Sequence, residues 1–375
     1  MTPSQPRILL SAGEPSGDLH GARIVAAFKR RFPHAIVHAV GGPLMEEAGA
    51  RLVCSIDELS TLGVLETLER LPAHFNLYRR LKRDLRAQAY QLVIPIDYPG
   101  FNLHLSQASR AAGVPVLYYI APQLWAWRPG RARRFARAVD RMAVILPFEE
   151  EFFNRVGLAS TFVGHPLLDG PPWPDRQEAR ARLDIPAEDR VLAIFPGSRR
   201  QEIRTHWETF RQVAAALVSE GRCDRVLVGG TGGGEYPDPG PTRLVRGQSR
   251  LVLAAADAAL VKSGTTTLEA AVAGTPMVVS YRVHPFTAFV VRRLVTVEWA
   301  SLVNLIAGRA VVPEVLQEDV SHGRLLTELR PLLKAGSPER QAQLDALAGL
   351  RRSLGRPGAA DRVVDLASDL VPAWR

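Results

Sequence analysis

The 375-residue sequence contains only two cysteines, Cys54 and Cys223. They lie far apart and have no ligand residues beside them, which favours a reducing compartment and predicts neither a disulfide framework nor a metal site. No stretch approaches 18 uninterrupted apolar residues, so we expect no membrane-spanning helix. The amino-terminal segment lacks a cationic start followed by a long apolar stretch, so we also expect no signal peptide.

Several motifs of common enzyme classes are absent as well. The sequence has no P-loop, no HExxH, no GxSxG, no GxGxxG and no Asp-x-Asp pair. The missing GxGxxG gives no support to nicotinamide binding, and the missing Asp-x-Asp removes the cation holder of many sugar-nucleotide enzymes. Charge on a leaving group would then have to be met by arginines and by the N-termini of helices.

Lysine is also scarce, although the formal net charge is +9. The excess of arginine is explained by nucleotide bias in the gene as readily as by selection, so the charge favours anionic partners without predicting a nucleic-acid binder. The chain length and an apolar content of 46% suffice for two domain cores.

The first half of the chain reads as a doubly wound parallel domain. Residues 7–11 and 35–40 are expected strands, separated by a Gly/Pro/Ser loop (12–18) and a helix (19–31). Ligands of such folds lie at the carboxyl ends of the strands. Asp97 follows the buried strand 92–96 and is the preferred general base, and the alternative is a carboxylate that caps the next turn through Asn102 or nearby amides. Alternative bases are Glu14, Asp18 and His20, for which organisation of the loop or of the helix start is the competing interpretation.

Two segments of this half are rich in arginine. Residues 59–86 combine apolar and cationic side chains, as in an interfacial helix, and equally fit a core helix with a basic solvent side. Residues 125–141 place two tryptophans beside an arginine cluster, which suits a phosphorylated ligand or a packed corner with a solvated helix.

The second half begins after a proline-rich linker (170–175) and repeats the α/β pattern. Residues 258–261 read as a strand, 263–265 as a turn, 266–273 as a helix that Gly274 and Pro276 stop, and 277–279 as the next strand. The helix start then faces the crevice above the sheet and suits a phosphate. Glu269, one turn further in, is placed to bind ribose hydroxyls, and an ordinary crossover remains the alternative. The turn at 196–199 has a similar position. Asn304 lies in an apolar run and needs a partner, from either the backbone or a ligand.

Six segments together resemble the lipid-A-disaccharide synthase family. They are residues 11–18 (SAGEPSGD), 119–127 (YIAPQLWAW), 164–169 (GHPLLD), 196–199 (PGSR), 263–269 (SGTTTLE) and 304–317 (NLIAGRAVVPEVLQ). The resemblance implies an α/β protein of the GT-B class, with two Rossmann-like domains facing a central cleft. It implies an inverting transfer that joins UDP-2,3-diacylglucosamine to 2,3-diacylglucosamine 1-phosphate through a β-1,6 linkage. It further implies no cofactor, no metal and peripheral association with the inner face of the cytoplasmic membrane through acidic phospholipid.

The resemblance also assigns residues. The catalytic set is Asp97, Arg199 and Glu14. The UDP-donor set is Gly197, Ser198, Arg199, Ser263, Gly264, Thr265, Glu269 and Asn304. The acceptor set is Gly13, Ser16, Gly17, Asp18, Gln123, Trp125 and Arg128. The surface for acyl chains and membrane is Leu62, Leu65, Leu68 and Phe75.

We expect an acceptor domain at 1–169, a UDP-sugar domain at 170–345, and helices at 346–375 that pack back on the first domain. A homodimer is left open. The sequence departs from the family pattern at Gly100, at Val303 and in a short segment from 229 to 245. Competing functions are another GT-B-like enzyme, such as a UDP-sugar 2-epimerase or a different lipid glycosyltransferase, and a non-enzymatic basic protein that binds membrane or nucleic acid.

Overall fold

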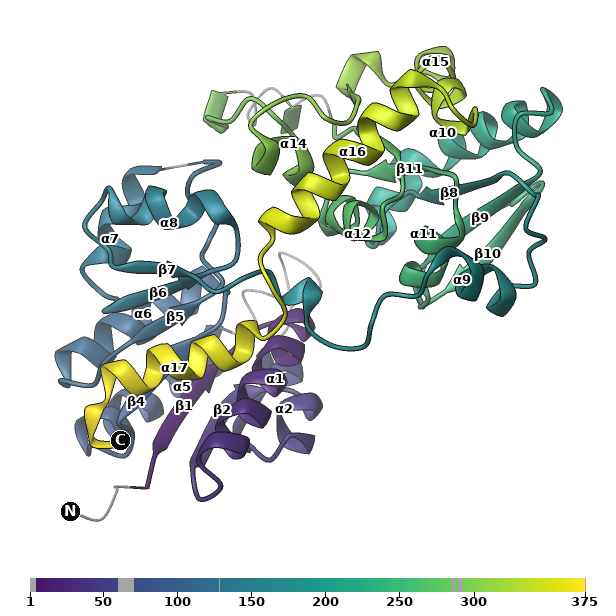
Figure 1. The fold of residues 1–375 in the computed structure, drawn as a ribbon. Helices are drawn as coiled ribbons and strands as arrows, with labels where there is room; N and C mark the ends of the chain where they lie inside the picture. The colour runs from purple at the N-terminus through teal and green to yellow at the C-terminus, as the bar shows by residue number, and fades with distance from the viewer. Residues whose placement is uncertain (1–4, 60–70, 128, 285–286, 289–292, 375) are drawn as a thin grey trace. The chain divides into compact units, whose positions relative to one another are not determined.

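The computed structural model describes residues 5–59, 71–127, 129–284, 287–288 and 293–374 (Figure 1). The chain forms two compact units. Unit 1 comprises Met1–Asp169 together with Leu354–Arg375, and unit 2 comprises Gly170–Ser353. The helix that spans residue 345 therefore belongs wholly to unit 2, and the second boundary lies at 353/354 rather than at 345/346. Leu62, Leu65, Leu68 and Arg128 lie outside the described residues.

Unit 1 contains a parallel sheet. Its strands are β1 (Arg7–Ser11), β2 (Ile36–Gly41), β3 (Arg51–Ser55), β4 (Leu92–Pro95), β5 (Leu117–Tyr119), β6 (Arg141–Val144) and β7 (Ser160–Phe162). They form two parallel ladders, in the orders β3-β2-β1-β4 and β5-β6-β7. Parallel bridges Val93↔Val116 and Ile96↔Tyr119 connect β4 with β5, so the order of the layer is that of a doubly wound fold.

Helices pack on both faces of this sheet. They are α1 (Pro15–Arg31), α2 (Pro43–Glu47), α3 (Ile56–Leu59), α5 (Leu71–Arg86), α6 (Pro99–Ala111), α7 (Ala132–Ala136), α8 (Pro147–Asn154) and α17 (Ala359–Leu370). One core joins β1, β2 and β4 to α1 and α17, and it includes Trp374, whose ring meets Phe28 edge-on. The other face packs against α5 and α6. Because both faces are covered, strands such as β4 are wholly apolar.

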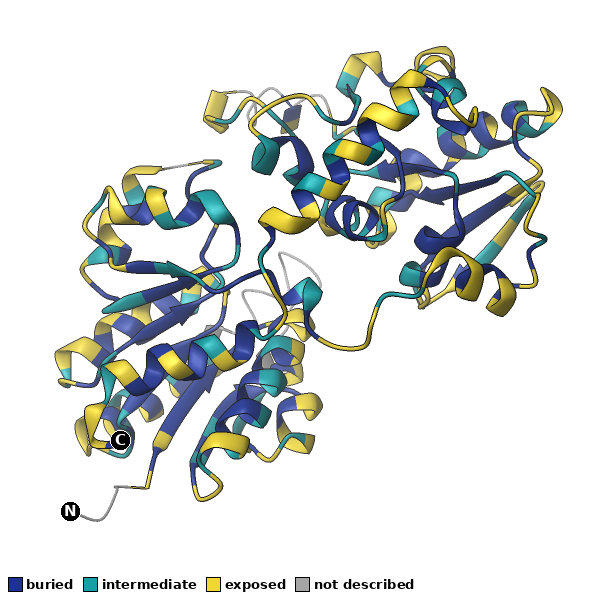
Figure 2. Cartoon of the chain, viewed as in Figure 1, coloured by how far each residue is buried: buried dark blue, intermediate teal, exposed yellow. Residues whose placement is uncertain are grey.

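Unit 2 is built in the same way around a six-stranded parallel sheet. The strand order is β10-β9-β8-β11-β12-β13. The bounds are β8 (Val191–Phe195), β9 (Arg225–Gly230), β10 (Thr242–Arg246), β11 (Ala258–Lys262), β12 (Met277–Tyr281) and β13 (Glu314–Leu316). The helices are α9 (Arg176–Arg182), α10 (Arg200–Ser219), α11 (Ser249–Ala255), α12 (Thr265–Ala273), α14 (Leu302–Ala307), α15 (His322–Leu333) and α16 (Pro338–Ser353). Figure 2 shows buried strands and helices whose outer sides are exposed. None of the helices within the described residues is long and apolar enough to cross a membrane.

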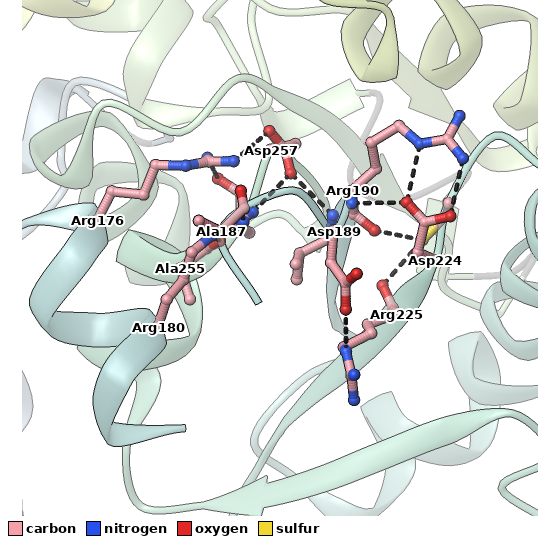
Figure 3. A network of polar contacts seen from close by, with 12 residues as sticks. Arg176, Arg180, Ala187, Asp189, Arg190, Asp224, Arg225, Ala255 and Asp257 are labelled. Carbon is pink, nitrogen blue, oxygen red and sulfur yellow. Dashed lines mark hydrogen bonds and ion pairs between the residues drawn. The ribbon is translucent and has the colours of Figure 1, made fainter. Parts of the chain in front are cut away.

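An arginine network lies at the amino ends of the unit 2 strands (Figure 3). The Asp257 carboxylate pairs with Arg176 at 2.6 Å and with the buried Arg180 at 3.0 Å, and it accepts the Val191 N–H at 2.8 Å. Arg180 also donates to the carbonyls of Ala255, Pro186 and Ala187. This network ties α9 to the starts of β8 and β11, at the edge opposite the strands' carboxyl ends, so its role is structural.

Candidate active site

The Asp97 turn of unit 1 has an unusual backbone conformation. Asp97 and Tyr98 come after Ile96, the buried residue that follows β4, and adopt positive φ angles of 46° and 51°. Two consecutive non-glycine residues in this region are costly and persist only where neighbours hold them. Tyr118 Oη donates to the Asp97 carbonyl at 2.6 Å, and Asn102 Nδ2 donates to the same oxygen at 2.8 Å. These bonds go to the main chain, so they fix the turn without using the carboxylate.

The buried Asn102 connects this turn with the end of β1. Its Nδ2 also donates to the carbonyl of Ser11 at 3.0 Å, and its Oδ1 accepts from Ser11 Oγ at 2.7 Å. The sequence interpretation of Asp97 as a cap that uses Asn102 has the roles reversed, because Asn102 holds the Asp97 backbone. Neither Asn102 nor Tyr118 was predicted as a site residue.

The Asp97 carboxylate has the electrostatics of a base. Its side chain reaches solvent, yet surrounding protein atoms displace part of its hydration, and this desolvation raises its pKa. The Tyr98 backbone N–H opposes the shift, and the nearby Glu14 carboxylate adds to it. A carboxylate with a raised pKa binds a proton more strongly than a free aspartate, which suits general base catalysis.

The predicted acceptor loop lies at the same edge, and it covers both the link after β1 and the first turn of α1, because the helix begins at Pro15 and not at the expected residue 19. A Cβ on Gly13 would lie 2.4 Å from the Tyr98 ring, so only glycine allows the loop to approach the Asp97 turn. Glu14 and Ser16 are exposed. Asp18 is buried and accepts N–H bonds from Gly42, Leu44 and Met45, so its carboxylate organises the start of α2. Among the other predicted loop residues, Gly17 is buried against Ala12.

His20, the remaining base candidate, lies in the first turns of α1. Burial and the neighbouring Arg23 lower its pKa to about 4, so it is neutral near pH 7. Its buried Nδ1 has no hydrogen-bond partner among the described residues.

Trp125 of the predicted acceptor set is largely a packing residue. It is buried, its Nε1 donates to Glu149 at 3.0 Å, and its ring meets Phe148 edge-on at 4.9 Å. Burial raises the pKa of Glu149 to about 7, although bonds from Trp125 and the start of α8 oppose the shift. No local sequence pattern predicts this pair, because its members are 24 residues apart. Gln123, in the same turn, is exposed.

The described part of the predicted membrane surface is α5. Phe75 is 59% exposed, which is high for a large apolar side chain, and the Arg79 guanidinium lies 5.7 Å from its ring centroid. Leu77, Leu81 and Leu85 of the same helix are buried in the core. One face of the helix therefore packs in the core, and the other presents an exposed aromatic side chain beside cations. These features fit both a core helix with a basic solvent side and an interfacial helix.

Unit 2 places two turns at the carboxyl ends of its neighbouring strands β8 and β11. After β8, Gly197 has a φ of 132°, and the exposed Ser198 and Arg199 begin α10. After β11, Ser263 Oγ donates to the Ala300 carbonyl at 2.7 Å, and Gly264 leads into α12, whose first residue Thr265 is exposed. No side chain of the described residues caps α12. Its first N–H groups and its positive dipole end suit an anion.

Glu269 lies one turn further along α12 and is half-buried. Burial raises its pKa, against the influence of Arg250 and of a hydrogen bond with Ser249. The carboxylate therefore lies close to the start of α11 and has one cation near it.

Asn304 is fully buried, and both ends of its amide have partners within the protein. Nδ2 donates to the Val312 carbonyl at 3.0 Å and to Glu314 at 2.8 Å, while Oδ1 accepts the N–H groups of Val311 and Val312. Glu314 in turn accepts the N–H groups of Ala300 and Ser301. Asn304 thus braces the loop that receives the Ser263 hydroxyl, and its partners are backbone groups and a carboxylate.

Among the described residues, no group of three His, Cys, Asp or Glu side chains is placed to hold a metal ion.

Comparison with known proteins gives consistent results at the levels of sequence and fold. The family model for lipid-A-disaccharide synthetase matches residues 8–228 and 241–355. A lipid-A-disaccharide synthase of Anaeromyxobacter sp. (strain K) is 39% identical over 368 residues, covering 96% of each chain. One of Myxococcus xanthus is 39% identical over 384 residues, covering 99% of each.

Solved structures resemble the chain in fold alone. A UDP-GlcNAc 2-epimerase from Neisseria meningitidis, bound to UDP-GlcNAc, has a TM-score of 0.66 at 11% identity, covering 97% of this chain and 100% of its own. The glycosyltransferase of kitacinnamycin has a TM-score of 0.65 at 17% identity, covering 99% and 100%. The expected GT-B fold with two Rossmann-like units is confirmed.

Proposed function

This chain belongs to the lipid-A-disaccharide synthetase family, and we propose that it joins UDP-2,3-diacylglucosamine to 2,3-diacylglucosamine 1-phosphate. It is a glycosyltransferase of lipid A biosynthesis, with a sugar nucleotide and a lipid-linked sugar as its substrates. The products are UDP and the β-1,6-linked disaccharide 1-phosphate. The anomeric carbon is inverted, because a single displacement brings the new oxygen to the face opposite the leaving group.

Asp97 is the general base of this proposal. The acceptor 6-hydroxyl attacks the anomeric carbon, its proton passes to the Asp97 carboxylate, and the bond to UDP breaks with its electron pair on the diphosphate oxygen. The observation that carries this assignment is the Asp97 turn: a strained strand end held through its main chain, with a carboxylate of raised pKa. Glu14 contributes by raising that pKa.

Unit 2 holds the donor. Arg199, the turn amides of Gly197 and Ser198, and the start of α12 at Ser263, Gly264 and Thr265 stabilise the departing diphosphate. Glu269 binds the ribose. Preorganised donors of this kind supply about 3–4 kcal/mol each to stabilisation of the transition state. Asn304 acts as a positioning residue, since its contacts hold the loop under the Ser263 turn.

The acceptor side consists of the loop with Gly13, Ser16, Gly17 and Asp18, and of the turn with Gln123, Trp125 and Arg128. Asp18 and Trp125 shape these segments through buried contacts. The acyl chains and the peripheral contact with acidic phospholipid involve α5 and the preceding residues, with Phe75 as the exposed apolar side chain. This surface would operate at the inner face of the cytoplasmic membrane. A homodimer stays open.

A UDP-release assay tests the function. The purified protein is given both acylated glucosamine substrates in detergent, with and without a chelator, and the product is identified by mass spectrometry. We expect UDP release that requires the acylated acceptor and is unchanged by the chelator. Epimerised UDP-sugar formed without acceptor would instead indicate an epimerase, and absence of saturable UDP binding would indicate a non-enzymatic protein.

A further inference from the structure

The turn after β8 already holds an anion of the protein itself. Glu202 lies in the first turn of α10, and its Oε2 accepts the N–H of Ser198 at 3.0 Å and that of Arg199 at 3.3 Å. Its Oε1 accepts from Lys262 Nζ at 2.9 Å. A Cβ on Gly197 would lie 2.5 Å from Glu202 Cβ, so the glycine allows the turn to fold closely over this side chain.

Lys262 is the cation of this arrangement. It is the last residue of β11, whose neighbour is β8, so its ammonium and the turn amides come from adjacent strand ends. Its side chain is 15% exposed and that of Glu202 is 21% exposed. Lys262 Nζ also lies 5.3 Å from the centroid of the Tyr281 ring. The pair is therefore partly shielded from water, where a charge interaction is stronger than at the open surface.

His206 supports the Glu202–Lys262 pair through the Glu202 main chain. The Arg282 N–H donates to its Nε2 at 3.0 Å, which leaves the ring proton on Nδ1, and Nδ1 donates to the Glu202 carbonyl at 2.8 Å. Burial lowers the pKa of His206, so this neutral form persists near pH 7. The imidazole thus ties the Glu202 backbone to the residue after β12, and within the described part of the chain the Glu202 carboxylate is held by the turn and by Lys262.

A nucleoside diphosphate is bound by hydrogen-bond donors and positive charge. The backbone N–H groups of a glycine turn and an ammonium group supply both. We propose that the Glu202 carboxylate occupies the place of the donor's diphosphate in the ligand-free protein, and that UDP-sugar binding displaces it and transfers Lys262 to the diphosphate. This inference rests on the proposed function, since it needs a diphosphate ligand in unit 2. Glu202 is then an internal competitor of the donor, and Lys262 is a further donor-binding residue.

Charge repulsion favours exchange of the Glu202 carboxylate for the diphosphate over binding of both anions at once. A diphosphate beside the Glu202 carboxylate would place like charges against each other and would have to share one ammonium and two N–H groups. Burial disfavours the Glu202 carboxylate, yet the Lys262 and turn bonds outweigh it and lower its pKa, so the carboxylate is charged at neutral pH. The competition therefore operates across the physiological range.

Calorimetric titration with UDP and with uridine tests the exchange. Glu202→Gln keeps an oxygen for the turn amides and removes the competing charge, so we expect UDP to bind about three- to tenfold more tightly. Lys262→Met should weaken UDP binding by about tenfold or more, the value of one charge-assisted hydrogen bond. Uridine, which has no phosphate, should bind all variants equally.

Two matched variants serve as controls. Glu208→Gln makes the same change at an exposed position of α10, and Lys334→Met removes an exposed lysine elsewhere in unit 2. Neither should alter UDP affinity. Weaker or unchanged UDP binding by Glu202→Gln would overturn the exchange, because Glu202 would then be a brace or a bystander. If Glu202→Gln does not fold, unchanged UDP affinity in Lys262→Met overturns it instead. A wild-type protein that binds no UDP would refute the proposed function itself.

Discussion

Replacement of Asp97 by asparagine separates its chemistry from its structural place. The left-handed φ of 46° is a conformation that asparagine adopts as readily as aspartate. The bonds from Asn102 and Tyr118 go to the main-chain carbonyl, so they survive the exchange. The variant should therefore fold with the turn intact and lack only a group that accepts the acceptor's proton.

The expected loss follows from the role of a positioned base. Such a base contributes about 10²–10⁴ to a rate. At 1.36 kcal/mol for each factor of ten, this is about 2.7–5.4 kcal/mol of transition-state stabilisation. Initial rates of UDP release at saturating substrates measure it as a fall in kcat, with KM for the donor little changed because the donor is held by unit 2.

The pKa of Asp97 adds a second measurement. The base works when deprotonated, so kcat/KM falls at acid pH, and the raised pKa places this fall above the pH of an ordinary aspartate. Glu14→Gln removes a charge that raises this pKa and should move the acid limb to lower pH.

The same shift has a consequence for stability. A carboxyl whose pKa is raised by folding favours the fold below its unfolded pKa, and that contribution is lost as the pH rises through the folded value. Asp97→Asn should thus be at least as stable as the wild type at pH 7 in urea denaturation.

The rate measurement decides the catalytic role. If the turnover of Asp97→Asn stays within about threefold of wild type, well short of the usual effect of a lost base, Asp97 is not the base.

Two further substitutions test the remaining assignments. Phe75→Glu should reduce co-sedimentation with vesicles of acidic phospholipid by about tenfold or more, because this is the binding free energy of one buried phenylalanine side chain. Asn76→Glu, at the exposed neighbouring position, is the control. An equal loss of co-sedimentation in both variants would contradict a specific apolar contact of Phe75. Asp257→Ala should lower the free energy of unfolding of unit 2 by about 3–5 kcal/mol in urea, because it leaves the buried Arg180 without its carboxylate. Asp224→Ala breaks the exposed ion pair between Asp224 and Arg190, so it should lower the free energy of unfolding by at most about 1 kcal/mol. Equal losses in Asp257→Ala and Asp224→Ala would refute the structural role of the Asp257 network.

Local patterns were sufficient to predict the elements that carry the site. The apolar run and the Ser-Gly-Thr turn of residues 261–281 predicted β11, α12 and β12, and these elements begin and end within a residue or two of the expected places. The helix ends where Gly274 takes a left-handed φ of 72°, as its C-cap glycine predicted. Asp97 was found because a polar residue directly after a buried apolar strand is a local signal.

Long-range partners could not be predicted in this way. Asn102 holds the Asp97 turn through contacts that reach residue 11, and Glu149 receives the Trp125 indole from another loop. Nothing in the neighbourhood of either residue distinguishes it from a polar side chain at the solvent surface. The exact pairing of Glu202 with Lys262, 60 residues apart, likewise depends on β8 and β11 being neighbours in the sheet.

The discontinuity of unit 1 bears on how the protein is made. Residues 170–353 are continuous, so unit 2 can complete its core as soon as they have left the ribosome. The core of unit 1 includes Val363, Ala367 and Trp374 packed against α1, whose residues were synthesised more than 300 positions earlier. The first half of the nascent chain must therefore wait with an apolar face of its sheet uncovered while all of unit 2 is translated. That interval is when the growing polypeptide is most exposed to aggregation, and it makes the unit that carries Asp97 the more dependent of the two on chaperones.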